Sequence, residues 1–338
     1  MVTGNRLISL TLVLAGLLSL GATEPASAFN IFPSLGGSRS GTAAMTFLRI
    51  TAGARAAAMA GAYSAICTDA FSLYHNPAGA VWAEKDNIAF AHRFWVADIS
   101  HNFIGITKHL GENNIIGLSL TSLTTDPIAV TDEYHPFGTG ETVDYSDLAI
   151  GGSYSVRLTD YFSFGLTIKY AQENLADLKM QATLIDLGTL YHTDFYGTRF
   201  AINMANFGPR LKPAGNYDYR TVSGELIRKE YQSFSPPTVF KVSVAFDPLA
   251  DNGNKLSCIS QLNHPTDNAE NIAFGLEYSL NDRLFLRGGY LVNSRVENLS
   301  LGGGLKIDLP FAGFSFDYAY TGMNDLGGTS NLSLVLGF

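Results

Sequence analysis

Charged residues and cysteines are both scarce in this sequence, and each shortage excludes a class of protein. Lys, Arg, Asp and Glu make up 15% of the 338 residues, the formal net charge is −8, and no run rich in Lys and Arg occurs. Nucleic-acid-binding proteins usually carry a basic patch or stripe, so we expect no nucleic-acid partner. The two cysteines, Cys67 and Cys258, show no clustered Cys/His spacing that would predict a structural zinc site. An exported protein could pair them or bury them separately.

Catalytic motifs are missing as well. The seven histidines are scattered, and the sequence has no Gly-x-Ser-x-Gly elbow, phosphate-binding loop or metal-ligand spacing. Enzymatic activity needs a nucleophile beside a base, or clustered carboxylates. We therefore expect neither an enzyme nor a cofactor, although a Ser/His pair brought together by folding stays open.

No stretch of 18 or more apolar residues occurs after residue 28, so no membrane-spanning helix is expected there. A shorter apolar run, Leu7 to Leu20, follows Arg6 and precedes the small residues Ala26 to Ala28. This order is typical of a cleaved signal peptide over residues 1–28, with the mature chain beginning near Phe29. No cysteine follows the cleavage site, so a lipid anchor is not predicted.

Glycine and aromatic residues are abundant, and after residue 86 apolar and polar residues alternate. The chain has 34 Gly, 22 Phe and 16 Tyr. In "FSFGLTIKY", residues 162–170, every even position is apolar or aromatic, whereas the odd positions hold Ser, Gly, Thr and Lys. Such a period of two predicts β-strands. Fourteen segments follow it, at 87–96, 99–109, 113–123, 142–157, 161–171, 179–193, 198–206, 238–247, 255–263, 270–280, 283–293, 297–308, 312–321 and 329–338.

A soluble β-sandwich would also alternate, but three features favour a transmembrane barrel over residues 87–338. Many segments reach ten residues, the length that a tilted membrane-spanning strand needs. Their polar faces are small or charged, as a barrel lumen would be. The two longest connections, 124–141 and 207–237, both follow odd-numbered strands and would lie on the outside, while both ends of the barrel would face the periplasm. We predict an all-β fold, a 14-stranded antiparallel transmembrane β-barrel in the bacterial outer membrane.

The C-terminus supports this prediction. The last strand ends on Phe338, and Leu332, Leu334 and Leu336 precede it at every second position. A terminal aromatic residue on an alternating strand resembles the signal that the outer-membrane barrel assembly machinery reads. We therefore expect that machinery as a partner during biogenesis, and outer-membrane lipid around the finished barrel.

Residues 29–86 do not alternate and predict a separate hatch of short helices and loops that plugs the lumen. A fourteen-stranded barrel is wider than an eight-stranded one, which side chains alone can fill. In "YHNPAGA", Asn76 should be extended because it precedes a proline, and Pro77 can open a short helix. Ala78 and Gly79 complete a tight turn, which is either a gate or a fixed part of the plug.

The hatch also contains charges that a lumen must neutralise. We expect Asp69 to pair with Arg49 or Arg55. Because the segment precedes the first strand, we expect it to begin in the periplasm.

The two long connections are candidate sites for partner binding, since long loops on a rigid scaffold commonly carry function. The first contains Tyr134, His135 and Phe137, and the second contains the aromatic residues Tyr217, Tyr219 and Tyr231. Exposed aromatic residues suit protein recognition. The alternative is an ordinary loop or lid.

The segment "AGAYSAICTDAFSLYHNPAGAV" resembles the N-terminal hatch of the FadL family of outer-membrane channels for hydrophobic compounds. The longer stretch "GTAAMTFLRITAGARAAAMAGAYSAICTDAFSLYHNPAGAV" is still more similar to the PorV/PorQ family, a branch with the same fold. The matching positions are Gly41 to Ala43, Phe47 to Ile50 and Gly53 to Ala62, and Ala60-Gly61 stands where that branch usually has Gly-Gly. The resemblance covers about 40 residues.

This resemblance implies two alternative functions. PorV-like members are accessories of type IX protein secretion, which receive cargo at an outer-membrane translocon and pass it to the surface-attachment machinery. FadL-like members are passive channels for fatty acids or other hydrophobic small molecules. The hatch motif does not separate the two, because both branches share it.

Overall fold

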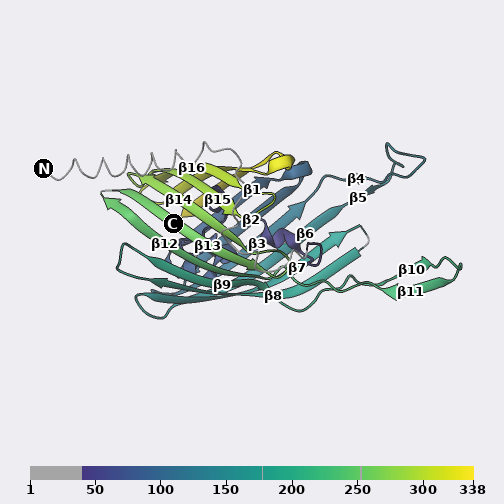
Figure 1. Cartoon of the computed structure of the whole chain (residues 1–338). Helices are drawn as coiled ribbons and strands as arrows, with labels where there is room; N and C mark the ends of the chain where they lie inside the picture. Colours follow the sequence, from purple (N-terminus) through teal and green to yellow (C-terminus); the bar gives the residue numbers. More distant parts are fainter. Residues whose placement is uncertain (1–39, 177, 252) are drawn as a thin grey trace. The chain divides into compact units, whose positions relative to one another are not determined.

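The computed structural model describes residues 40–176, 178–251 and 253–338. The predicted signal peptide lies outside these residues. Within them, fourteen antiparallel strands close into a barrel, in which β1 pairs with both β2 and β18, and the two longest connections carry small hairpins of their own (Figure 1). The predicted fold is confirmed. The barrel strands are β1 (Asn87–Phe94), β2 (Ser100–His109), β3 (Asn114–Thr124), β6 (Tyr145–Arg157), β7 (Phe162–Leu175), β8 (Leu178–His192), β9 (Arg199–Phe207), β12 (Val239–Asp251), β13 (Asn254–Pro265), β14 (Asn271–Leu280), β15 (Leu284–Val292), β16 (Leu299–Asp308), β17 (Gly313–Gly322) and β18 (Gly328–Gly337).

Alternation along the strands gives the wall two different faces. On β7, Thr167 and Lys169 are buried toward the inside, whereas Ile168 and Tyr170 are exposed on the outside. The other strands repeat this arrangement, so an outward band of Leu, Ile, Phe and Tyr surrounds a polar lumen. Such a face suits contact with lipid chains. None of the helices in the described part of the chain is long and apolar enough to cross a membrane.

The C-terminal strand closes the wall. Leu332, Leu334 and Leu336 of β18 pair with residues of β1. They lie on the partly exposed outer face of the wall. The amide of Phe338 donates a hydrogen bond to the Asp86 carbonyl at 2.9 Å, which joins the end of the chain to the start of β1.

The two longest connections leave the same end of the barrel. The first carries β4 (Ile128–Ala129) and β5 (Thr142–Val143), and the second carries the hairpin of β10 (Asn216–Arg220) and β11 (Leu226–Glu230). Both extend beyond the wall in Figure 1. The first odd-numbered connection, between β1 and β2, is short and holds the 3₁₀ turn η4 (Val96–Asp98). A further 3₁₀ turn, η5 (Asn324–Leu326), lies between β17 and β18.

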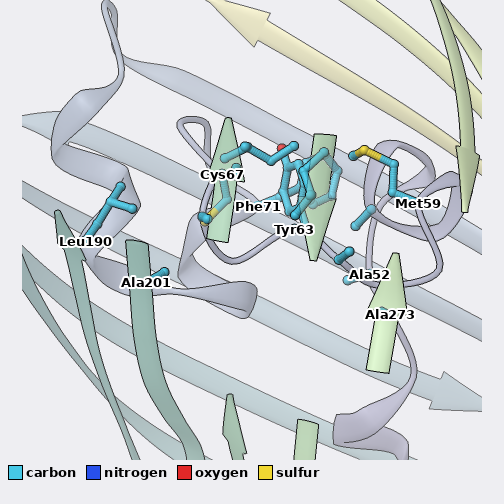
Figure 2. Packing of buried hydrophobic residues seen from close by; sticks show 14 of the residues in the cluster. Ala52, Met59, Tyr63, Cys67, Phe71, Leu190, Ala201 and Ala273 are labelled. Atoms are coloured by element: carbon cyan, nitrogen blue, oxygen red, sulfur yellow. The ribbon is translucent and has the colours of Figure 1, made fainter. Parts of the chain in front are cut away.

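The hatch packs against the inside of the wall. Its elements are η2 (Thr46–Arg49), α2 (Ala54–Ala58), α3 (Ser72–His75) and η3 (Pro77–Trp82). Figure 2 shows the largest apolar cluster, in which Met59, Tyr63 and Phe71 of the hatch meet alanines of the wall. Small wall residues leave room for the hatch, since Ala201 on β9 and Ala273 on β14 are both buried beneath it.

The hatch runs through the lumen from one end to the other. At its start, the amide of Ala44 donates to the Ser235 carbonyl at 3.1 Å, in the long connection before β12. At its end, Asp86 lies beside His109 and Phe338, at the mouth with the short turns. The expectation that this segment begins in the periplasm is therefore wrong for the described residues. The order of segments along the chain does not determine at which mouth the hatch begins. The backbone hydrogen bond between Ala44 and Ser235 places that beginning at the mouth with the long connections.

The two cysteines are free. Cys67 is buried in the hatch, whereas Cys258 lies on β13 between the buried, inward-facing Ser257 and Ile259. Alternation turns Cys258 to the outer face of the wall. The barrel wall therefore separates the two thiols, and a disulfide between them is not formed.

The direction of the hatch predicts different accessibility at its two ends. In a chain with Cys67 and Cys258 replaced by serine, Ser40→Cys should react with a membrane-impermeant maleimide on intact cells, because Ser40 is exposed before the outer mouth. Glu112→Cys, in the short turn after β2, is the matched control and should react only after the outer membrane is permeabilised. Equal labelling of both positions in intact cells would contradict the direction described here.

Candidate functional site

The Asn76–Gly79 turn is held by hydrogen bonds on both sides. Asn76 is extended, with φ −161° and ψ 103°, and its Oδ1 accepts a hydrogen bond from the Ala78 amide at 3.2 Å. Its Nδ2 donates to the Ser64 carbonyl at 3.0 Å and to the Thr189 carbonyl at 3.1 Å. Pro77 then occupies the first turn of η3, where its missing amide leaves no donor unpaired. The sequence prediction for this turn agrees with the structure.

Glycines in the wall allow the backbone of the turn to approach closely. A Cβ placed on Gly165 of β7 would lie 2.3 Å from the Ala78 nitrogen, and one on Gly188 of β8 would lie 2.0 Å from Asn76 Oδ1. The two glycines are register partners, so they form one gap in the inner face. Neighbouring serines complete the seat by donating hydrogen bonds to hatch carbonyls at 2.8 Å, from Ser155 to Pro77 and from Ser163 to Ala78.

A second contact between hatch and wall is ionic. Arg55 of α2 donates twice to the Glu277 carboxylate of β14, at 2.8 and 2.7 Å. Arg287 of β15 also donates to Glu277, and its Nη1 lies 2.6 Å from Asp317 Oδ1 of β17. Two arginines and two carboxylates thus form a buried network without net charge, the arrangement that makes burial of charge tolerable.

The other predicted charges of the hatch have different partners from those expected. Arg49 pairs with Asp267 at 2.6 Å, in the connection after β13. Asp69 accepts hydrogen bonds from Tyr63 Oη at 3.0 Å and from the Phe71 amide at 2.9 Å. The predicted ion pair of Asp69 with Arg49 or Arg55 is not formed, because acidic residues of the wall and its loops pair with both arginines. Arg55 interacts with the charge of Asp69 only beyond ion-pair distance.

Asp267 of the connection after β13 and the wall residues Glu277 and Arg287 are therefore part of the site. The sequence prediction of site residues did not include them. The sequence feature that could have identified such residues is a charge on the polar face of an alternating strand, as at Glu277 and Asp317. The described residues contain no group of three or more His, Cys, Asp or Glu side chains that could hold a metal ion.

The first outer loop presents aromatic side chains to solvent. Phe137 is fully exposed and Tyr134 is 86% exposed. The turn that carries them is organised by Asp132, whose carboxylate lies 2.9 Å from His135 Nδ1 and accepts from the Tyr134 amide at 2.8 Å. Slight desolvation opposes ionisation of Asp132, but the hydrogen bonds from His135 and Tyr134 outweigh it and lower the pKa of the carboxyl.

The second outer loop gathers its predicted tyrosines into one cluster. The ring of Tyr217 lies 5.3 Å from that of Tyr231 and 6.3 Å from that of Tyr219, measured between centroids. Lys229 Nζ lies 4.8 Å from the centre of the Tyr219 ring, a cation–π geometry. Lys212 pairs with Glu230, and this hydrogen bond and charge lower the pKa of the Glu230 carboxyl.

Comparison with known proteins places this architecture in context. A family model described as "Type IX secretion system protein PorV" matches residues 36–267. One similar solved structure is the CymD monoaromatic hydrocarbon channel, with TM-score 0.58 and 13% identity; the alignment covers 86% of this chain and 98% of that chain. Another is the toluene transporter TodX of P. putida, with TM-score 0.59 and 11% identity; the alignment covers 85% of this chain and 98% of that chain. The toluene transporter TbuX of Ralstonia pickettii has TM-score 0.56, 14% identity and coverage of 84% and 96%.

At such low identities, the likeness to these channels shows the fold alone. No match was found among curated proteins. The family match, the closed barrel and its apolar outer face together establish a β-barrel of the bacterial outer membrane.

The gap at Gly165 and Gly188 predicts that an alanine substitution on the inner face of the wall lowers stability, whereas one on the outer face does not. Gly165→Ala should lower stability by about 1–3 kcal/mol, the usual cost of overpacking, because the new methyl group meets hatch backbone. Heat-dependent gel mobility would measure the unfolding midpoint, and protease cleavage within residues 42–82 would report loosening of the hatch. Gly152→Ala, on the outer face where a Cβ meets nothing within 4 Å, is the control. Equal behaviour of the two variants would contradict the seat.

The ionic network predicts a change in ion conductance. Glu277→Gln leaves Arg55 and Arg287 without their shared carboxylate, and breaking a buried ion pair costs ~3–5 kcal/mol. We expect α2 to loosen and the conductance of single barrels in a planar bilayer to rise. Glu141→Gln, in the exposed first outer loop, should conduct like the unaltered protein. Unchanged conductance and thermal stability in Glu277→Gln would show that the network does not hold the hatch.

Proposed function

The chain belongs to the PorV family, whose model covers residues 36–267, and we propose that it is a non-catalytic accessory of type IX protein secretion. It would bind a secretion translocon or its cargo at the outer surface through the two long loops. The family match carries this proposal. The positions of Tyr134, His135 and Phe137 in one loop and of the tyrosine cluster in the other support it.

The loops offer the kind of surface that protein partners bind. Aromatic residues are enriched at interfaces, where they bury a large apolar area and use few rotatable bonds. Phe137 and Tyr134 are held apart from the barrel core by the short β4–β5 ladder, whereas Tyr217 and Tyr219 stand on the β10–β11 hairpin. The hairpin residues Asn216 to Arg220 pair in regular register with Leu226 to Glu230, so this surface is preorganised.

The close fit of the hatch supports binding of a partner at the outer surface rather than passage of a solute through the lumen. Backbone of the Asn76–Gly79 turn contacts the wall, α2 is tied to Glu277, and η2 is tied to Asp267. A binding role leaves these contacts intact, whereas passage of a large solute would require many of them to break together.

A passive channel for hydrophobic compounds is the second candidate. The similar structures are a monoaromatic hydrocarbon channel and toluene transporters, and the hatch of this chain has an apolar core around Met59, Tyr63 and Phe71. In this case a small apolar solute would pass beside or through the hatch, and the Asn76–Gly79 turn would be the gate.

A pull-down from the native outer membrane tests the proposal. We expect the tagged protein to co-purify with a large barrel or with surface-attachment proteins. The paired changes Tyr134→Ser/Phe137→Ser or Tyr217→Ser/Tyr219→Ser should weaken capture roughly 30-fold, which corresponds to a hot-spot loss of about 2 kcal/mol.

Phe311→Ser is the matched control, since it removes an exposed aromatic residue from the turn between β16 and β17, at the opposite mouth. Lipid mass spectrometry of the same eluate separates the two candidates. A barrel that comes out alone with a bound fatty acid or other apolar compound would overturn the secretion proposal and favour the channel.

A further inference from the structure

The outer face of the wall has a hollow at Gly152 on β6. Gly152 points away from the lumen, and a Cβ built on it meets no heavy atom within 4 Å. Its register partners on the two neighbouring strands are Leu118 of β3 and Ile168 of β7, which are 66% and 52% exposed. A residue without a side chain thus stands between two long apolar side chains.

This hollow is part of a groove of about 560 Å³ that spans four strands. Binding sites for small molecules commonly measure ~300–1,000 Å³, so the groove is large enough for a ligand. Its walls are almost wholly apolar and come from β2, β3, β6 and β7. Its apolar and aromatic lining side chains are Ile106, Ile116, Leu118, Tyr154, Leu166 and Ile168.

One end of the groove carries a positive charge. Lys108 on β2 pairs in register with Ile116, which in turn pairs with Tyr154, so the lysine lies one row closer to the short turns than Gly152. Lys108 faces outward and is exposed. Among the described residues it forms no ion pair within 4.0 Å, and the Asp86 carboxylate, which pairs with His109, interacts with its charge at longer range. Tyr154 Oη donates to Asn114 Oδ1 at 2.6 Å, which adds a second polar group at this level.

The position of the groove relative to the membrane surface indicates which class of ligand it would bind. The short turns mark the periplasmic side of an outer-membrane barrel, and a lysine near that edge can extend its ammonium to the headgroup level. An apolar groove with a cation at its interfacial end matches a lipid chain with an anionic headgroup, and basic side chains beside a membrane attract such headgroups.

We propose that this groove is a specific binding site for one anionic phospholipid of the periplasmic leaflet. One acyl chain fills the space over Gly152 between Leu118 and Ile168, and the phosphate lies against Lys108. This inference rests on the wall alone and is independent of the secretion proposal.

Photolabelling tests the site directly. The full-length protein would be placed in nanodiscs of phosphatidylcholine containing a small fraction of phosphatidylglycerol with a diazirine on one acyl chain. Peptide mass spectrometry after illumination should find the label concentrated on β3, β6 and β7. Gly152→Leu fills the groove and should reduce that labelling about tenfold, which corresponds to roughly 1.4 kcal/mol.

Two further variants complete the test. Gly288→Leu, at another outward glycine where a Cβ lies 3.6 Å from Leu301, should leave the labelling of β3, β6 and β7 unchanged. Lys108→Gln changes an exposed side chain and so keeps the fold, and it should abolish the preference for a phosphatidylglycerol probe over a phosphatidylcholine probe.

Heat-dependent gel mobility would confirm that each variant is folded. Labelling spread evenly around the barrel, or unaffected by both Gly152→Leu and Lys108→Gln, would overturn the proposal. Loss of a co-purifying protein in Gly152→Leu, with lipid labelling unchanged, would also overturn it and assign the groove to a protein partner.

Discussion

The close approach of hatch backbone to the barrel wall is the constraint on which the rest of the structure depends. The Asn76–Gly79 turn reaches the inner face only because Gly165 and Gly188 have no side chains where the turn lies. With the turn fixed there, the hydroxyl groups of Ser155 and Ser163 donate hydrogen bonds to the carbonyls of Pro77 and Ala78, so these buried backbone groups have partners. This local fit fixes one end of the hatch against β6, β7 and β8.

The fixed turn also determines which charges meet. With the hatch set against β6, β7 and β8, α2 lies against β15 to β18, and Arg55 reaches Glu277. Arg287 and Asp317 then complete a neutral network, so no charge in it is buried without a partner. At the outer mouth, Arg49 and Ser235 tie the start of the hatch to two different connections. These contacts favour a lumen that stays filled by the hatch.

Much of the wall could be predicted from the sequence, because a period of two is a local property that each strand carries by itself. Lys169 and Thr167 on one face, and Ile168 and Tyr170 on the other, specify inside and outside without knowledge of neighbouring strands. The tight turn at Asn76 was also predictable, since Pro77 restricts its own backbone and that of the residue before it.

The contacts of the hatch could not be predicted in the same way. Arg55 of the hatch pairs with Glu277 of β14, which lies 222 residues further along the chain. That contact depends on how the hatch is seated against the wall, which no local pattern specifies. The direction of the hatch depends on backbone hydrogen bonds with Ser235, which any residue type could make. The groove at Gly152 arises from the register of four strands, and alternation does not specify register between strands.

The most direct test of the account is to lock the hatch and measure secretion. Ala43 and Ser235 pair across a parallel bridge, where backbones lie close enough for a disulfide between Ala43→Cys and Ser235→Cys in a chain without its native cysteines. Because Asp86 anchors the other end, the locked hatch cannot leave the lumen. If the chain serves secretion from its outer surface, as proposed, cells with the oxidised, locked protein should secrete cargo as well as cells in which the disulfide is reduced. Loss of secretion on oxidation, restored by a reductant, would show that the hatch must move and would contradict it.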